Sequence, residues 1–302
     1  MKFKKSLLQK NSLGAINHIP TLSEFLRQID LNKIKLKKIE ALLHGSFQST
    51  INGPGFDFNE IREYRIGDDL RHISWNATAK TGNLQTKEYF SEKEIRSYFL
   101  IDISNSMFCG NKIDPFIQLV AYLLNLACGF SEKIGGVFFS ENIQCQFPLG
   151  MPNTQANVIF QTFINYYNNL NQKITVEPST TNLSKALEFT KKYFSKKGIV
   201  FIISDFLNFS TITNWEKIIY DAAQKQNIYS FQIYDPLDFE LPRSGYISFV
   251  DPETKEYFLV NTDSKIIHEK YYKLMKEKQE NLKKFLKTSS INHITIEKSD
   301  FM

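Results

Sequence analysis

Two uninterrupted apolar runs, each ending abruptly in polar residues, constrain the fold of this 302-residue chain more than any other feature. The first run covers Ser97 to Ile103, and the second covers Gly198 to Ser204. Such runs are typical of strands buried on both faces, as in parallel sheets covered by helices. Stretches with helical spacing of apolar residues follow each run. The sequence therefore predicts an α/β fold with a central, mostly parallel sheet and helices on both faces.

The remaining pattern divides the chain into two parts. Further strands are expected at 134–140, 143–147, 228–234 and 293–297, with a hairpin inside 241–260, and helices at 115–132, 153–170, 183–194, 215–224 and 263–287. Upstream, residues 21–43 have helical spacing, and residues 46–90 contain short β-prone runs separated by turn residues such as Asn52-Gly53-Pro54-Gly55. We predict an N-terminal helical and β-rich segment at 1–91 and an α/β domain at 92–302.

Charge and cysteine content restrict the function classes. The formal net charge is +5, and the lysines are dispersed among carboxylates, so a nucleic-acid-binding stripe is not expected. Three sparse cysteines are typical of a reducing compartment. The longest apolar segment, Ile117 to Phe130, is interrupted by polar residues and is short for a bilayer span. These features predict a cytoplasmic protein without a membrane span.

Oxygen-bearing side chains follow three of the predicted elements. Asp102, Ser104 and Ser106 lie where the first run ends, Thr181 opens a predicted helix, and Asp205 ends the second strand. Ligands of open α/β sheets bind beyond the carboxyl ends of the strands. Carboxylates and hydroxyls are hard oxygen donors, which predicts a site for Mg²⁺, or for Mn²⁺ or Ca²⁺. Because such a site contains few direct carboxylates, the metal would remain electrophilic and could bind an acidic side chain of another protein.

Each of these residues also has a simpler interpretation. Asp102 and Ser104 could cap the next helix, Thr181 could be an N-cap, and Asp205 could be a turn residue. One alternative function is a metal-dependent phosphohydrolase with Asp102 as nucleophile, but the acid/base that this chemistry needs two residues later is replaced by Ser104. Another is an RNA-binding scaffold. Taken together, the residues favour binding over catalysis, and we do not expect an enzyme.

These motifs resemble a known adhesion site. Asp102-x-Ser104-x-Ser106, Thr181-Asn182-Leu183 with Ala186-Leu187, and Ser204-Asp205 are similar to the metal-ion-dependent adhesion site of von Willebrand factor A domains. The resemblance implies a Rossmann-like fold in which Ser104, Ser106 and Thr181 bind the metal directly, while Asp102 and Asp205 act largely through water. Ser179-Thr180 stands where that family usually has Gly-Gly.

A second motif lies upstream of this domain. Arg62-x-Tyr64-x-x-Gly67-Asp68-Asp69-x-Arg71-x-x-x-Trp75 resembles the bacterial family called domain of unknown function 58, with Ser74 and Lys80 departing from its usual Asp and Arg. The resemblance implies an adaptor that works with a MoxR-type AAA+ ATPase and contacts an acidic residue of the ATPase or of its client.

The motif residues themselves have two interpretations. They could form a partner-docking surface, made of Arg62, Tyr64, Asp68, Asp69, Arg71 and Trp75. Alternatively, local ion pairs lock a turn at Gly67-Asp68, with Tyr64 and Trp75 packed beneath it.

Overall fold

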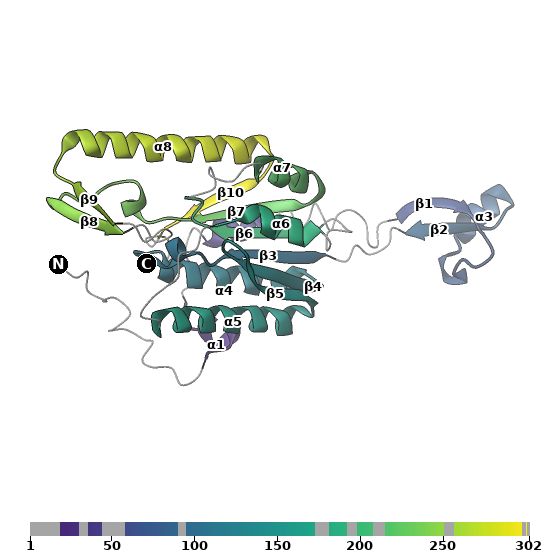
Figure 1. Ribbon diagram of the computed structural model, residues 1–302. Helices are drawn as coiled ribbons and strands as arrows, with labels where there is room; N and C mark the ends of the chain where they lie inside the picture. Colours follow the sequence, from purple (N-terminus) through teal and green to yellow (C-terminus); the bar gives the residue numbers. More distant parts are fainter. Residues whose placement is uncertain are drawn as a thin grey trace.

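A computed structural model describes residues 19–29, 36–43, 58–89, 95–172, 181–191, 198–207, 215–250, 257–297 and 300. Figure 1 shows a layered body built around a central sheet, and a smaller unit that projects away from it. The predicted domain boundary at residues 91 and 92 lies outside the described residues.

The central sheet has six strands in the order β10-β7-β6-β3-β4-β5. The strands are β3 (Arg96–Asp102), β4 (Lys133–Phe139), β5 (Ile143–Gly150), β6 (Ile199–Ser204), β7 (Asn227–Ile233) and β10 (Asn292–Ile296). All neighbours pair in parallel except β4 and β5, which form an antiparallel hairpin. Counted within the sheet, this is the 3-2-1-4-5-6 order of Rossmann-like folds. The predicted Rossmann-like fold of the von Willebrand factor A type is therefore confirmed.

Helices cover both faces of this sheet, as Figure 1 shows. On one face lie α1 (Leu22–Leu26), residues 36–43, α4 (Ile113–Phe130) and α5 (Pro152–Gln172). On the other face lie α6 (Leu183–Lys191), α7 (Trp215–Lys225) and α8 (Lys265–Thr288). The alternation along β3 explains the two cores, because Phe99 and Ile101 belong to the first and Tyr98 and Leu100 to the second.

The helix α4 changes one expectation from the sequence. It begins four residues earlier than the segment judged too short, and its 18 residues are long and apolar enough to cross a membrane by length and composition alone. Here α4 packs as a core helix, with most of its side chains buried against the sheet, α1 and α5. Length and composition therefore do not distinguish the two roles for this segment.

The projecting unit contains β1 (Phe58–Glu63), η1 (Leu70–His72), α3 (Trp75–Thr81) and β2 (Gln85–Tyr89). The two strands pair antiparallel, consistent with the expected β-rich character. The helix α3 was not predicted. It ends at Gly82, whose left-handed backbone (φ 77°) is favourable for glycine and terminates the helix.

A second hairpin, β8 (Tyr246–Val250) and β9 (Tyr257–Asn261), precedes α8 and agrees with the predicted one. Its expected turn, and the turn at Asn52–Gly55, lie outside the described residues.

Candidate functional site

The predicted metal-site residues gather at the carboxyl edge of the central sheet. Asp102 is the last residue of β3, and Asp205 follows the last residue of β6. These strands are parallel neighbours in the register Ile101 to Ile203, so the two carboxylates emerge at the same edge. This is where Rossmann-like sheets bind ligands.

The Thr181 loop is attached to this edge through β4. The amide of Asn182 donates to the carbonyl of Ser140, directly after β4, at 2.8 Å. The amide of Ile103 donates to the carbonyl of Phe139, the last residue of β4, also at 2.8 Å. The segments that carry the predicted ligands therefore lie at the same edge of the sheet, and the five side chains are buried: Asp102, Ser104, Ser106, Thr181 and Asp205.

Asp102 is the central acceptor of the site. Its Oδ1 accepts a hydrogen bond from the Ser104 amide at 2.9 Å, and its Oδ2 accepts one from the Ser204 hydroxyl at 2.6 Å. The Ser104 hydroxyl lies 3.1 Å from the Ser106 hydroxyl and makes no capping bond to η2 (Asn105–Phe108). Capping by Ser104 therefore does not account for this hydroxyl.

Burial, and after it the negative charge of Asp205, raises the pKa of Asp102 to about 7, despite the lowering effect of the serine hydrogen bonds. Two carboxylates are thus held close together in a poorly solvated site. A bound cation would relieve this unfavourable interaction.

Lys112 is a buried residue at this edge of the sheet that sequence reasoning missed. Its ammonium group lies 3.0 Å from Asp205 Oδ2 and 3.3 Å from Asp238 Oδ2, and only 2% of its side chain is exposed. Burial lowers the pKa of Lys112, but the two carboxylates outweigh this effect and raise the pKa overall. The lysine is therefore charged inside the protein.

Asp238 and Asp235 come from the turn after β7. Asp238 closes η4 (Pro236–Asp238), and its Oδ2 accepts from the Asp235 amide at 2.9 Å. Asp235 Oδ2 accepts from the amide of Asn111 at 2.7 Å, which joins this turn to the loop that carries Lys112. The sequence contains one indication of this turn. Asp235 directly follows the predicted strand 228–234, so it is expected at the same edge of the sheet.

The donor set of this edge fits a hard divalent cation. Asp102, Asp205 and Asp238 carry three carboxyl groups, while Lys112 supplies one positive charge. Within the described ranges, no group of three or more His, Cys, Asp or Glu side chains is arranged to hold a metal. A cation here would therefore use the Ser104, Ser106 and Thr181 hydroxyls beside the carboxylates, a chemistry suited to Mg²⁺.

The upstream motif forms a separate surface. Arg62 makes two hydrogen bonds to the Asp68 carboxylate, at 2.7 and 2.9 Å, and these hydrogen bonds lower the pKa of Asp68 to about 2. Arg71 pairs with Asp69 at 2.7 Å. The predicted ion pairs are present, but the packing of Trp75 beneath them is wrong, because 68% of Trp75 is exposed.

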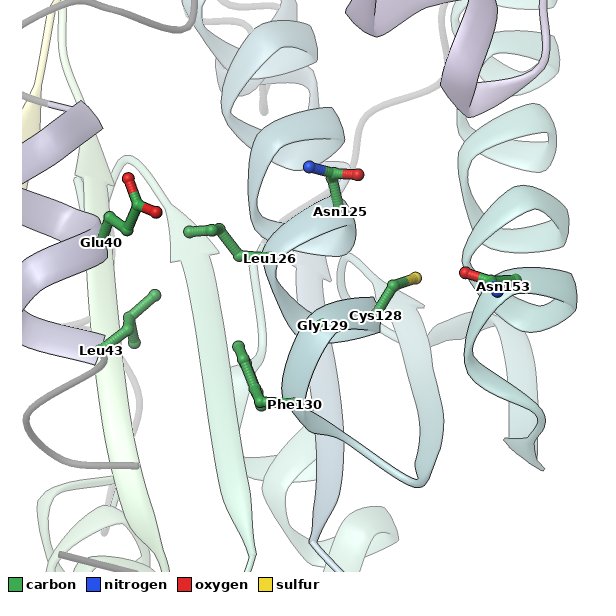
Figure 2. Close-up of a pocket in the computed structure, with 8 residues that line it drawn as sticks. All are labelled: Glu40, Leu43, Asn125, Leu126, Cys128, Gly129, Phe130 and Asn153. Atoms are coloured by element: carbon green, nitrogen blue, oxygen red, sulfur yellow. The ribbon is translucent and has the colours of Figure 1, made fainter. Parts of the chain in front are cut away.

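A pocket of about 450 Å³ lies at the far end of α4 from Lys112. Figure 2 shows Glu40 and Leu43 on the helix of residues 36–43 facing Leu126 and Phe130 of α4, with Asn153 of α5 on the opposite side. None of the predicted site residues lines this pocket, so it is distinct from the candidate metal site.

Comparisons with known proteins place these residues in a family context. A family profile described as "Protein of unknown function DUF58" matches residues 60–281, more than half of the chain. The uncharacterized protein Mb1516 of Mycobacterium bovis is 25% identical over 244 residues, which cover 78% of this chain and 72% of the relative.

Two solved structures from Bacteroides species are similar in fold. The conserved hypothetical protein BatB of Bacteroides thetaiotaomicron has a TM-score of 0.41 at 12% identity and covers 67% of this chain and 90% of its own. An aerotolerance-related membrane protein of Bacteroides fragilis has a TM-score of 0.43 at 13% identity and covers 68% and 93%. Both TM-scores are below 0.5, so the fold assignment rests on the strand order.

The description of the second structure corrects one expectation. A cytoplasmic location was predicted from the cysteines and the short apolar segment, whereas the Bacteroides fragilis neighbour is described as a membrane protein. The prediction of a cytoplasmic protein is therefore wrong, and cysteine content and a short apolar run were insufficient grounds for it.

Proposed function

Because this chain belongs to the family described as Protein of unknown function DUF58, and its von Willebrand factor A-like fold is suited to adhesion or protein interaction, we propose that it is a non-enzymatic, metal-dependent protein-binding module. Its metal site would bind an acidic side chain of a partner. The partner we propose is a MoxR-type AAA+ ATPase, or the client protein that this ATPase remodels.

One observation carries this proposal, namely the buried cluster at the carboxyl edge of the sheet. Asp102 and Asp205 lie there beside the serine hydroxyls, with more carboxylates than cationic groups. Burying uncompensated charge is unfavourable. A fold that keeps such a cluster is consistent with a bound cation as part of its functional state.

The proposed metal is Mg²⁺, with Mn²⁺ or Ca²⁺ as substitutes in the same oxygen environment. Ser104, Ser106 and Thr181 would hold it, and Asp102 and Asp205 would balance its charge. The metal would supply Lewis acidity toward a carboxylate of the partner. The chain's own residues would orient this ion and exclude bulk water from it.

The arrangement of Asp102 favours binding over hydrolysis. Both of its carboxylate oxygens accept hydrogen bonds, and its side chain is fully buried. A nucleophile needs a free lone pair that faces the substrate, and a nearby acid/base group. Ser104, two residues later, has no ionisable group for that task.

The projecting unit supports a second contact with the partner. In residues 60–87, whose side-chain burial is described, no hydrophobic residue is buried, while several large ones are exposed: Ile61, Ile66, Leu70, Trp75 and Leu84. Exposed apolar groups gathered on one small unit mark protein-interaction surfaces. Beside the ion-paired arginines, Trp75 is the anchor that we expect a partner to cover.

The test measures binding of the purified protein to a MoxR-type AAA+ ATPase from the same cell by biolayer interferometry, with Mg²⁺ and with EDTA. The variants are Asp102→Asn and Trp75→Ser, and Asp221→Asn on the exposed face of α7 is the matched carboxylate control. We expect binding only with Mg²⁺, an affinity lowered at least about tenfold in both site variants, and no change in the control.

Equal binding in EDTA would refute the metal-dependent contact. Release of phosphate from p-nitrophenyl phosphate that is lost in Asp102→Asn would instead favour the phosphohydrolase.

A further inference from the structure

Lys112 occupies an unusual position for a buried cation. It is the N-cap residue of α4, where the positive end of the helix dipole disfavours a further positive charge. Its ammonium is nevertheless almost completely buried, between Asp205 at 3.0 Å and Asp238 at 3.3 Å. A buried charge in this position needs its partners to remain stable, so the contacts with these carboxylates are specific structural features.

The second partner, Asp238, is itself held in place. It forms a capping box with Asp235, whose carboxylate also accepts the amide of Asn111 next to Lys112. The Tyr271 hydroxyl of α8 donates to the Asp238 carbonyl at 3.0 Å. The turn after β7 therefore fixes the lysine from one side, independently of Asp205.

On the other side, Lys112 engages the carboxylate that would face the metal. Asp205 Oδ2 accepts from Lys112, and Asp205 Oδ1 accepts from the Leu207 amide at 3.3 Å. The turn between them is tightly specified, since Phe206 adopts a left-handed backbone (φ 57°) and its amide donates to the Ser204 hydroxyl. Both oxygens of Asp205 are thus occupied by protein donors.

From this geometry, and on the basis of the proposed function, we propose that Lys112 is a positioning residue that acts as an internal counter-ion of the metal site. It holds Asp205 away from direct coordination and offsets part of the negative charge that would attract a cation. The free protein therefore binds a divalent ion more weakly than its donor set allows. The bound metal ion then has fewer anionic ligands than it can accept, so a carboxylate from the partner completes its coordination.

The experiment compares Mn²⁺ binding by isothermal titration calorimetry in the full-length wild-type protein and in the double variant Lys112→Met with Asp238→Asn. The second substitution removes one of the two carboxylates that the first would leave without a cation. We expect the double variant to bind Mn²⁺ at least about tenfold more tightly, because Asp205 becomes available as a charged oxygen ligand. The Mn²⁺-induced rise in melting temperature should increase in parallel.

The matched control is Asp238→Asn alone, which keeps Lys112 on Asp205 and should leave the Mn²⁺ affinity at or below the wild-type value. If the double variant does not fold, Lys112→Gln removes the charge but keeps a hydrogen-bond donor, and the same direction of change is expected.

The outcomes separate the two ideas. If the wild-type protein binds Mn²⁺ and the variants that lack the Lys112 charge bind it no more tightly, the proposed role of Lys112 is overturned. The metal-dependent function is not affected by that result. An absence of Mn²⁺ binding in every variant overturns the metal-dependent function and this inference with it. Binding that appears only when Lys112 is replaced supports the inference.

Discussion

Replacing Gly110 with alanine tests whether the turn after β7 holds the loop that carries Lys112. Gly110 has a φ of +67°, and a Cβ atom added there would lie 2.7 Å from Asp235 Oδ2. The carboxylate cannot move away freely, because Oδ2 accepts from Asn111 and Oδ1 accepts from Leu237 at 3.0 Å. The substitution must therefore strain the backbone or break a hydrogen bond of Asp235.

The expected cost follows from these two effects. A left-handed conformation costs a residue with a Cβ about 1 kcal/mol, and a lost hydrogen bond to a charged group costs about 1.5–3 kcal/mol. Gly110→Ala should thus lower the free energy of unfolding by about 2.5–4 kcal/mol. For a domain of this size, that corresponds to a fall in melting temperature of roughly 5–15 °C.

The assay is urea unfolding followed by circular dichroism, with Gly245→Ala as the matched control. Gly245 has a similar φ of +73°, but the nearest atom to its added Cβ is Asp263 Oδ2 at 3.8 Å. The control should show the conformational cost alone, about 1 kcal/mol. If Gly110→Ala costs no more than Gly245→Ala, the Asp235 carboxylate does not hold the loop and the reasoning is refuted.

Three further predictions concern the rest of the body. Burial, with a smaller effect from Lys283, lowers the pKa of His293 to about 4. The unfolded chain therefore binds more protons than the folded protein between pH 6.5 and 4, and the free energy of unfolding should fall by about 2–3 kcal/mol as the pH drops through this range. His293→Gln should remove that pH dependence in urea titrations at each pH. An unchanged slope of the free energy of unfolding against pH would contradict the assignment. Cys109 is exposed, whereas partial burial raises the pKa of the Cys128 thiol to about 11. Iodoacetamide at pH 8 should therefore label Cys109 first, as followed by mass spectrometry, and equal labelling rates would contradict this difference between the two thiols. Phe163 is fully buried among aromatic rings. Phe163→Ala should therefore lower the free energy of unfolding, measured by chemical denaturation, by about 3–5 kcal/mol, and a decrease below about 1 kcal/mol would place this residue outside the core.

The strands and helices of the body were predictable because their signals are local. The run from Tyr98 to Ile101 is apolar at every position, and β3 is buried on both faces as this pattern predicts. The position of Asp102 at the strand end followed directly from where that run stops. The helix α3 was missed because seven residues give too short a window for helical periodicity to be recognised.

The exposure of Trp75 could not be predicted for a different reason. Tryptophan side chains are highly buried on average. Whether Trp75 is buried depends on whether another element of the protein covers it. The sequence contains no signal for that coverage. The same holds for α4, since its composition suits both a core helix and a membrane span, and only its packing against the sheet, α1 and α5 shows a core helix.

The sequence alone indicated the strands of the sheet, their ends and the oxygen-bearing side chains of Asp102, Ser104 and Asp205 at those ends, because periodicity and motif spacing encode them over short distances. Only the tertiary structure placed Lys112 between Asp205 and Asp238, which lie 93 and 126 residues away. Those contacts depend on the order in which β3, β6 and β7 pair in the sheet. That order arises from packing over the whole domain, so no local pattern reveals that a lysine lies beside the proposed metal site.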